Sequence, residues 1–515
     1  MHYFCKAGPF VVVASVWACA APAANKCSEL LEYAAVGVTI EKAGDVPAGV
    51  IPPAPGGAPT PIQVPAHCRV SGVVGAHVGA DGKRYGIRFA VAMPANWNGR
   101  LLYQGGGGLN GSVQPPVGAT ASGDSSALVR GFAVVTSDSG HEGAVFDSSF
   151  FADQQASLDF LYQSIGKVLV VARPLISGHY NHPIEHSYFV GCSTGGREAM
   201  ISAQRYPNDF DGIVAGSPAM RTNYSNLATA WITVSLNSVA PKDAQGHLLT
   251  SQALSDSDRK RFVAGLLKSC DALDGVKDGM IFNIRGCHFD PQVLQCGGPK
   301  KDGCLSAAQV QAIKRGFAGP VTTGGIKVYP GFPYDTGNGF KGRGIPGLLS
   351  GGLSPVGPAP ATAEMNVDEA ATAAHDAREM AGDTDAWTNL SSFAGHGGKL
   401  IFYHGMSDPW FSALDTLGYY ERLSADNKPG PVHDWSRLFL VPGMGHCGGG
   451  EATLDRFDML SAIVDWVEKG HAPEEVTATG TAFPGRSRPL CAYPRHAQYS
   501  GSGDPESAAN FSCQD

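Results

Sequence analysis

A serine, an aspartate and a histidine occur along this chain in the order of one known type of nucleophilic triad. Ser193 lies in the string GCSTGG, which is a G-x-S-x-G box; Asp408 ends the string HGMSD, and His446 lies in the string GMGHC. In such a triad the histidine takes the serine proton, the aspartate orients the imidazole, and an acyl-serine intermediate forms. The three residues are therefore candidates for the nucleophile, the acid and the base of a hydrolase.

The residues around Ser193 are typical of a nucleophile elbow. Such an elbow needs a strand, a tight turn with small residues beside the serine, and a helix. The runs 188–191 and 197–205 have strand and helix character, and they flank Ser193. A bare G-x-S-x-G string is common by chance in a chain with 67 glycines. Its position between a strand and a helix favours a catalytic serine.

Strand-like runs alternate with helix-like runs over most of the chain, which predicts a parallel sheet covered on both faces. Asp408 and His446 each follow a strand, and the order Ser, Asp, His is that of an α/β-hydrolase. The fold predicted is therefore an α/β-hydrolase. The expected strands are 85–93, 100–104, 131–137, 188–191, 213–217, 400–403 and 437–441, and the expected helices of this part are 151–176, 197–205 and 460–469.

The oxyanion hole of such an enzyme has two backbone donors. The amide of Thr194, directly after the serine, is the first candidate. The second should come from the four glycines 105–108, with Gly107 or Gly108 nearest. The alternatives are a flexible loop without a catalytic role or a nucleotide-binding loop. A nucleotide-binding loop is disfavoured because the sequence has neither a G-x-G-x-x-G string after a suitable strand nor a Walker lysine.

A long insertion divides the sheet. The strand–helix alternation stops near Met220 and returns near Leu400, about 180 residues later. The intervening segment has helical runs at 256–269 and 306–316 and a Gly/Pro-rich stretch at 317–360. An insertion of this length predicts a second domain or lid. We expect a catalytic domain at 25–220 and 396–515 and a lid at 221–395.

The N-terminus is typical of an export signal at residues 1–24. Lys6 precedes an apolar stretch, 9–21, that is too short to cross a bilayer and is followed by small residues. We expect cleavage between Ala20 and Ala24 and a secreted or periplasmic protein without a transmembrane segment. Lipid attachment at Cys19 is the alternative, although Trp17 makes a poor lipid-attachment site.

Twelve cysteines occur in the chain, and removal of Cys5 and Cys19 with the signal would leave ten. An even number in an exported protein predicts five disulfides, whose pairing the sequence alone leaves open. Buried free thiols are the alternative, and zinc is disfavoured because no C-x-x-C pair occurs. Cys192 is rejected as a nucleophile because it occupies the variable position of the box.

The composition bounds the partners. The formal net charge is −8, and the longest basic run is the triplet 259–261. Nucleic acid is therefore an unexpected partner. The oligomeric state stays open.

The strings GCSTGG, HGMSD and GMGHC together resemble those of the tannase and feruloyl esterase family, which also contains a bacterial hydrolase of mono(2-hydroxyethyl) terephthalate. The resemblance covers nearly all of the mature chain. It implies a secreted carboxylic-ester hydrolase whose serine and histidine neighbours form a disulfide. The pairs it implies are Cys192–Cys447, Cys27–Cys68, Cys270–Cys287, Cys296–Cys304 and Cys491–Cys513.

Residues 271–280 place three aspartates in one glycine-rich turn. Calcium prefers such oxygen ligands, but this spacing is not an EF-hand, and an Asp/Gly-rich turn alone is more often only a turn. The family resemblance implies a structural calcium ion here, far from Ser193, and no organic cofactor. Its ligands would be the side chains of Asp271, Asp274 and Asp278 and the carbonyls of Val276 and Met280.

The same resemblance implies a small aromatic ester as the substrate, with feruloyl esters as first choice. Tannase activity on galloyl esters is the second, and hydrolysis of mono(2-hydroxyethyl) terephthalate is a further alternative, for which Arg343 is a poorly matching carboxylate partner. A peptidase, an amidase and a catalytically dead binding protein stay open. Aromatic residues that could stack on the acyl group are Phe332, Tyr334, Phe340, Trp387, Trp410 and Phe411.

Overall fold

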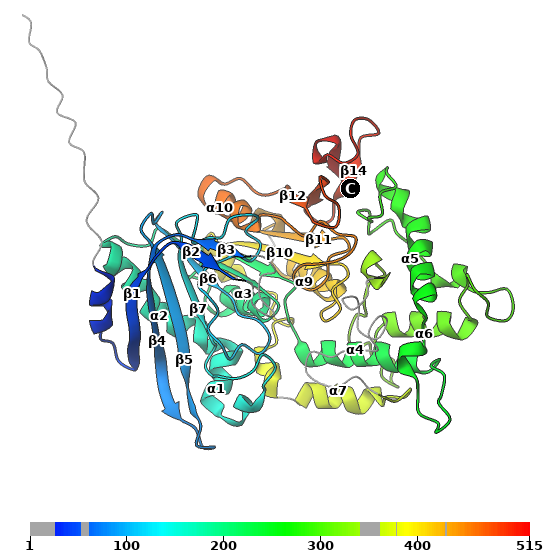
Figure 1. Ribbon diagram of the computed structural model, residues 1–515, viewed down its shortest axis with the longest axis horizontal. Helices are drawn as coiled ribbons and strands as arrows, with labels where there is room; N and C mark the ends of the chain where they lie inside the picture. Colours follow the sequence, from blue (N-terminus) through cyan, green and yellow to red (C-terminus); the bar gives the residue numbers. More distant parts are fainter. Residues whose placement is uncertain (1–25, 53–60, 340–360, 377, 428–429) are drawn as a thin grey trace, which may run out of the picture.

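The fold is built on one nine-stranded sheet (Figure 1). The computed structural model describes residues 26–52, 61–339, 361–376, 378–427 and 430–515. The export signal thus lies outside the described residues. In spatial order the strands are β1 (Val38–Val46), β4 (His67–Val78), β5 (Arg84–Pro94), β7 (Ala133–Ser137), β6 (Arg100–Gln104), β8 (His186–Cys192), β9 (Gly212–Gly216), β10 (Lys399–Gly405) and β11 (Ser436–Val441).

The sheet is mixed, which corrects the expectation of a parallel sheet. From β7 to β11 every neighbouring pair is parallel, but β1, β4, β5 and β7 pair antiparallel. The parallel strands β8 and β9 are almost wholly buried, and such strands form the continuous apolar runs that the sequence shows. β1 lies at the edge and only Ile40 in it is buried, so its apolar pattern is weak.

Helices cover both faces of the sheet, as expected. One face packs on α2 (Ser164–Tyr180), α3 (Thr194–Arg205) and α9 (Ala413–Asp426), and the other packs on α10 (Met459–Lys469). The helical run expected over 151–176 is present, but it begins at Gln154 and continues to Tyr180. Asp153 is extended and its side chain accepts a bond from the Ala156 amide, so α1 (Gln154–Leu158) begins there, and a π-helical turn joins α1 to α2.

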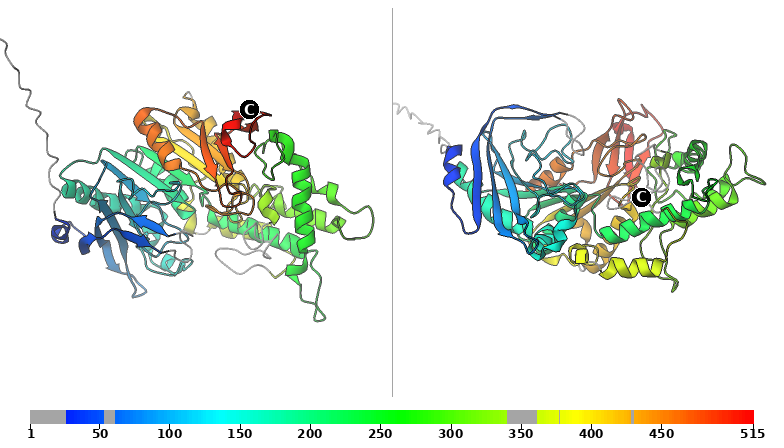
Figure 2. Two further views of the ribbon diagram at one scale, coloured as in Figure 1. Left: turned by 45° about the horizontal axis from the view of Figure 1, so that its top comes forward. Right: turned by 60° about the horizontal axis from the view of Figure 1, so that its bottom comes forward.

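The segment between β9 and β10, residues 217–398, is called the inserted segment below. It holds α4 (Thr222–Asn237), α5 (Asp256–Cys270), α6 (Ala307–Phe317), α7 (Val367–Asp376) and α8 (Ser391–Gly395). Capping boxes begin α5 and α6, and a separate apolar cluster joins α4, α5 and α6. Figures 1 and 2 show α4 to α7 beside the β11 end of the sheet, away from β1 and β4.

All five predicted disulfides are present, at S–S distances between 1.89 and 2.02 Å. No described helix has the length and apolar character needed to cross a membrane. Small hairpins complete the fold. The hairpins pair β2 (Gly49–Ile51) with β3 (Ile62–Val64), β12 (Glu475–Thr479) with β13 (Ser487–Cys491), and β14 (His496–Tyr499) with β15 (Phe511–Gln514).

Candidate active site

Ser193 occupies the tight turn between β8 and α3. Its backbone has φ 65° and ψ −123°, a conformation that residues other than glycine rarely adopt. The Ser193 amide donates to the Gly216 carbonyl, and the Ser193 carbonyl accepts from Arg197 and Ala219, which hold the turn in place. This is the strained strand–turn–helix of a nucleophile elbow.

The glycines of the box are required by close backbone contact. A Cβ on Gly191 would lie 2.4 Å from the Gly195 carbonyl oxygen, and one on Gly195 would lie 2.7 Å from the Gly106 carbonyl oxygen. A Cβ on Gly196 would lie 2.3 Å from the Gly216 carbonyl oxygen. The box therefore presses the elbow against the 105–108 loop, where the second oxyanion donor was expected.

Asp408 and His446 meet across two loops. Each loop follows a neighbouring strand, β10 for Asp408 and β11 for His446, and His446 Nδ1 lies 2.7 Å from Asp408 Oδ2. The Asp408 carboxylate is buried, and its Oδ1 accepts from the amides of Trp410 and Phe411. The pairing is the one a serine triad needs between its acid and its base.

His404, in the HGMSD string, is a second histidine on the same carboxylate, with no role assigned from the sequence. Its Nε2 lies 3.3 Å from Asp408 Oδ2 and 3.0 Å from the Phe411 carbonyl, and its Nδ1 lies 2.8 Å from Thr416 Oγ1. Burial raises the pKa of Asp408, but the His446 charge and the hydrogen bonds from His404 and His446 outweigh it and hold that pKa well below its usual range.

The disulfide Cys192–Cys447 joins the residues next to Ser193 and His446. The two Cα atoms are 5.9 Å apart, so the elbow and the histidine loop are adjacent although 255 residues separate them in the sequence. His446 Nε2 is buried and has no hydrogen-bond partner among the described residues. An unpartnered imidazole nitrogen beside the elbow is available to accept a proton.

The 105–108 loop is held by a buried carboxylate that sequence reasoning missed. Glu198 on α3 accepts from the Gly106 amide at 2.9 Å, from Asn110 Nδ2 at 2.8 Å and from Ser139 Oγ at 3.0 Å. The sequence shows an acid one helical turn after Thr194 but does not reveal its burial. Around it, the amides of residues 105, 106, 109 and 110 are all hydrogen-bonded, whereas in the described part of the chain those of Gly107 and Gly108 have no such partner.

The loop predicted to bind calcium is compact, and two of its three aspartates, Asp271 and Asp278, have protein partners. Burial, with repulsion from Asp278 and Asp271, raises the pKa of Asp274 to about 7. Asp278 is paired with Arg488 at 2.5 Å, and Asp271 accepts from the amides of residues 278 and 279. The oxygen donors fit calcium in kind, but no described group of three or more His, Cys, Asp or Glu side chains is gathered to hold a metal.

The aromatic candidates divide by position. Trp410 and Phe411 lie against the His446 ring, with centroids 4.7 and 5.3 Å away. Phe332 and Tyr334 pack in the apolar cluster of the inserted segment, and Trp387 is 62% exposed. Phe340 and Arg343 lie outside the described residues.

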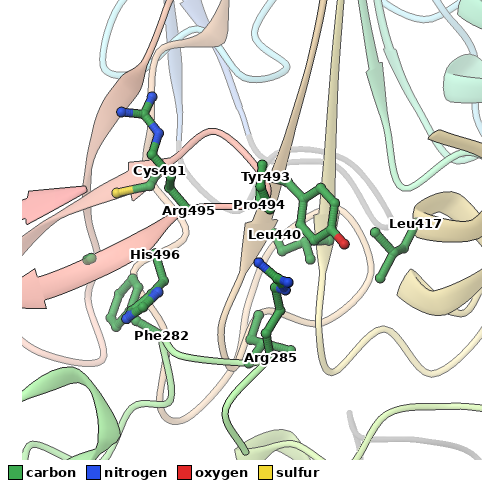
Figure 3. Close-up of a pocket in the computed structure, with 11 residues that line it drawn as sticks. Phe282, Arg285, Leu417, Leu440, Cys491, Tyr493, Pro494, Arg495 and His496 are labelled. Carbon is green, nitrogen blue, oxygen red and sulfur yellow. The ribbon is translucent and has the colours of Figure 1, made fainter. Parts of the chain in front are cut away.

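A pocket elsewhere is lined by none of the catalytic candidates (Figure 3). It lies between residues 282–285 of the inserted segment and residues 491–497, and Arg285 and Tyr493 point into it. Arg495 on its wall is already paired with Glu474. We therefore place the candidate site at the elbow and not at this pocket.

Comparison with known proteins identifies the family. A family model described as tannase and feruloyl esterase matches residues 68–343 and 360–514. The chain belongs to this family. It is 40% identical to the mono(2-hydroxyethyl) terephthalate hydrolase of Piscinibacter sakaiensis over 519 aligned positions, which cover 87% of this chain and 85% of that protein. It is 30% identical to a "Probable feruloyl esterase" of Arthroderma benhamiae, over 90% of this chain and 88% of that one.

Solved structures of family members share the fold. Feruloyl esterase B from Aspergillus oryzae superposes with a TM-score of 0.74 at 27% identity, covering 94% of this chain and 98% of that one. The tannin acyl hydrolase of Aspergillus niger, at 20% identity, gives a TM-score of 0.71 over 96% and 93%. The predicted α/β-hydrolase fold is confirmed. The family and the named relatives show that this chain is a carboxylic-ester hydrolase.

Removal of the disulfide beside the site tests its role in this esterase. In a Cys192→Ala/Cys447→Ala variant we expect kcat to fall far more steeply than the melting temperature, because the bond holds the histidine loop against the elbow. For a closed loop of this length, a purely entropic model assigns about 5 kcal/mol of stability to the bond. Steady-state kinetics and thermal unfolding measure the two effects.

The matched control is Cys491→Ala/Cys513→Ala, which removes a disulfide of the C-terminal hairpins. We expect it to lower stability and leave kcat within about two-fold of the wild type, because this bond joins neither the elbow nor the histidine loop. Unchanged kcat in the first variant would show that the Cys192–Cys447 bond is only a structural tie.

Proposed function

We propose that this family member is a secreted serine esterase that cleaves small esters of aromatic acids, with feruloyl-type esters as its preferred substrates. The contact between Asp408 and His446, held beside Ser193 by the Cys192–Cys447 bond, carries the proposal. Trp410 lies against the imidazole and is partly exposed, so it offers aromatic surface for the acyl group, whereas Phe411 beside it is buried.

In the proposed mechanism, Ser193 Oγ attacks the ester carbonyl carbon while His446 Nε2 takes the hydroxyl proton. Asp408 stabilises the imidazolium and keeps Nδ1 protonated. The carbonyl oxygen becomes an oxyanion, which the amides of Thr194 and of Gly107 or Gly108 bind. When the C–O bond to the alcohol breaks, His446 returns the proton to the leaving alkoxide. Water then releases the acid from Ser193 by the same steps.

Hydrolysis of mono(2-hydroxyethyl) terephthalate is the second candidate function, because the relative with that name is 40% identical over most of both chains. Galloyl esters are the third candidate, which the family description supports. The three substrates differ in the acyl group: a hydroxycinnamoyl chain, a ring with a free carboxylate, or a trihydroxybenzoyl ring. The surface that binds the acyl group would therefore distinguish the three esters by how tightly it binds each transition state.

A substrate panel tests the proposed function. Methyl ferulate, mono(2-hydroxyethyl) terephthalate and methyl gallate are compared by kcat/KM, and the highest value is expected for methyl ferulate. A higher value for either of the others assigns the function to that ester. A matched ferulic amide separates an esterase from an amidase, which would cleave both.

Secretion and the lid belong to the same proposal. Five disulfides support an oxidising compartment. N-terminal sequencing of the exported protein is expected to place its first residue between positions 21 and 25.

The separate apolar cluster of the inserted segment supports a lid domain beside the catalytic domain. Limited proteolysis is expected to cut within the inserted segment first.

We also propose that the loop at residues 271–280 binds a structural calcium ion through Asp271, Asp274 and Asp278, with the carbonyls of Val276 and Met280. A calcium ion would offset the repulsion among the three carboxylates beyond what the pairing of Asp278 with Arg488 already provides. Treatment with EDTA is expected to lower the melting temperature by several degrees, and calcium is expected to restore it. A ligand at about 100 times its Kd stabilises by about 2.7 kcal/mol.

Asp274→Asn is expected to remove the response to calcium, whereas Asp302→Asn, which changes an exposed aspartate of the same segment, should keep it. Equilibrium dialysis gives a second readout, with one ion bound per chain. A melting temperature that is the same with EDTA and with calcium contradicts the proposal.

A further inference from the structure

A turn of the inserted segment, Asp335 to Gly337, lies directly against the two loops that carry the acid and the histidine. We propose that Asp335 is a positioning residue: it holds the acid loop and the histidine loop at the separation that the Asp408–His446 bond needs. The proposal rests on the proposed function, because it concerns the same site. It makes the inserted segment part of the catalytic apparatus as well as a cover.

One carboxylate oxygen joins the two loops. Ser407 Oγ donates to Asp335 Oδ2 at 2.6 Å, and the Gly443 amide donates to the same oxygen at 2.7 Å. Ser407 is the residue before Asp408, and Gly443 lies three residues before His446. Each donor therefore lies within three residues of Asp408 or His446 in the chain.

The rest of the turn strengthens this contact. The Gly337 amide donates to Ser407 Oγ at 2.9 Å, so the hydroxyl is held by the inserted segment on two sides. A Cβ on Gly337 would lie 2.2 Å from Ser407 Cβ, and one on Gly443 would lie 3.1 Å from Thr336 Oγ1. The turn therefore packs closely on Ser407 and lies near Gly443.

Burial makes the contact costly to lose. Asp335 is 3% exposed and Ser407 is 1% exposed. Burial raises the pKa of Asp335, while the bonds from Ser407 and from the amides of Thr336 and Gly443 oppose that rise. A buried amide or hydroxyl that loses its partner costs about 1–3 kcal/mol. Moving either loop away from Asp335 would therefore leave a buried donor without its partner and raise the free energy of the folded protein.

The two loops also touch each other directly, through the Ser407 amide on the Met444 carbonyl and the Met406 amide on the Val441 carbonyl. Loss of Asp335 should thus loosen their spacing and leave the fold intact. A displacement of about 1 Å in a catalytic group can lower the rate by about 100-fold.

The test compares Asp335→Ala with Asp335→Asn, using a small aryl ester. In the alanine variant kcat is expected to fall by about 100-fold while KM changes by less than about three-fold, since the spacing of the triad and not substrate binding is altered. The asparagine carbonyl can accept both hydrogen bonds, so kcat should recover to within about ten-fold of the wild type.

Asp258→Ala is the matched control. Asp258 is a buried carboxylate of the same segment, but it caps α5 and pairs with Lys300. This variant should lose stability and keep kcat. The proposal is overturned if Asp335→Ala keeps the wild-type kcat, if Asp335→Asn is as poor as the alanine variant, or if Asp258→Ala loses the same activity. A wild type that turns over no ester would instead overturn the proposed function.

Discussion

Alanine at position 193 is expected to lower the kcat of ester hydrolysis by about a million-fold, the effect of removing the nucleophile from a serine triad. Without the hydroxyl no acyl-enzyme can form, and only the oxyanion donors and substrate binding remain. The melting temperature should change little, because alanine meets the same backbone strain at φ 65°. Burst kinetics and mass spectrometry of the trapped acyl-enzyme measure the loss.

Ser202→Ala is the matched control for this variant. It removes a hydroxyl from the same helix, α3, where Ser202 Oγ donates to the Glu198 carbonyl. Its kcat should stay within about two-fold of the wild type. Residual turnover by Ser193→Ala at more than about a hundredth of the wild-type rate would contradict a nucleophilic role for Ser193.

Asparagine at position 408 should lower kcat by about 10,000-fold, as the same change does in other triads. Oδ1 of Asp408 accepts two backbone amides, whereas Oδ2 faces His446 and His404. An asparagine must turn its carbonyl to the amides and its NH₂ group to the histidines. His446 Nδ1 then becomes an acceptor, Nε2 carries the proton, and the base is lost.

The same change alters the pH dependence of stability. The folded pKa of Asp408 is lower than its unfolded value, so its ionised form stabilises the wild type above the unfolded pKa of about 3.9. That stability is lost as the pH falls toward the folded pKa. In Asp408→Asn this acid-range loss should be absent in urea unfolding between about pH 2 and 5. Asp209→Asn, on a half-exposed ion pair with Arg173, is the control and should keep both kcat and the wild-type slope.

Much of the fold and site could be predicted from the sequence because the features are local. The elbow is a strand, a small-residue turn and a helix within 20 residues, and the buried parallel strands form continuous apolar runs. The order of Ser193, Asp408 and His446 and the even cysteine count are likewise readable without coordinates. The resemblance of the motifs then supplied the disulfide pairing.

Other features required the tertiary structure. The edge strand β1 has only one buried residue and little apolar pattern, and the helical run expected over 151–176 begins only after Asp153, whose side chain bonds to the Ala156 amide. His404, Glu198 and Asp335 gained their roles only from contacts that span long sequence separations or depend on side-chain direction.

The sequence by itself therefore determined the family and the candidates for the triad, because the elbow motif and its proposed partners are specified by residue type, order and short-range pattern. Only the tertiary structure decided which groups hold them. Asp335 meets Ser407 and Gly443 across 72 and 108 residues of chain, and no local periodicity reports such a contact. The precision of a triad depends on packing between distant segments, which local sequence does not encode.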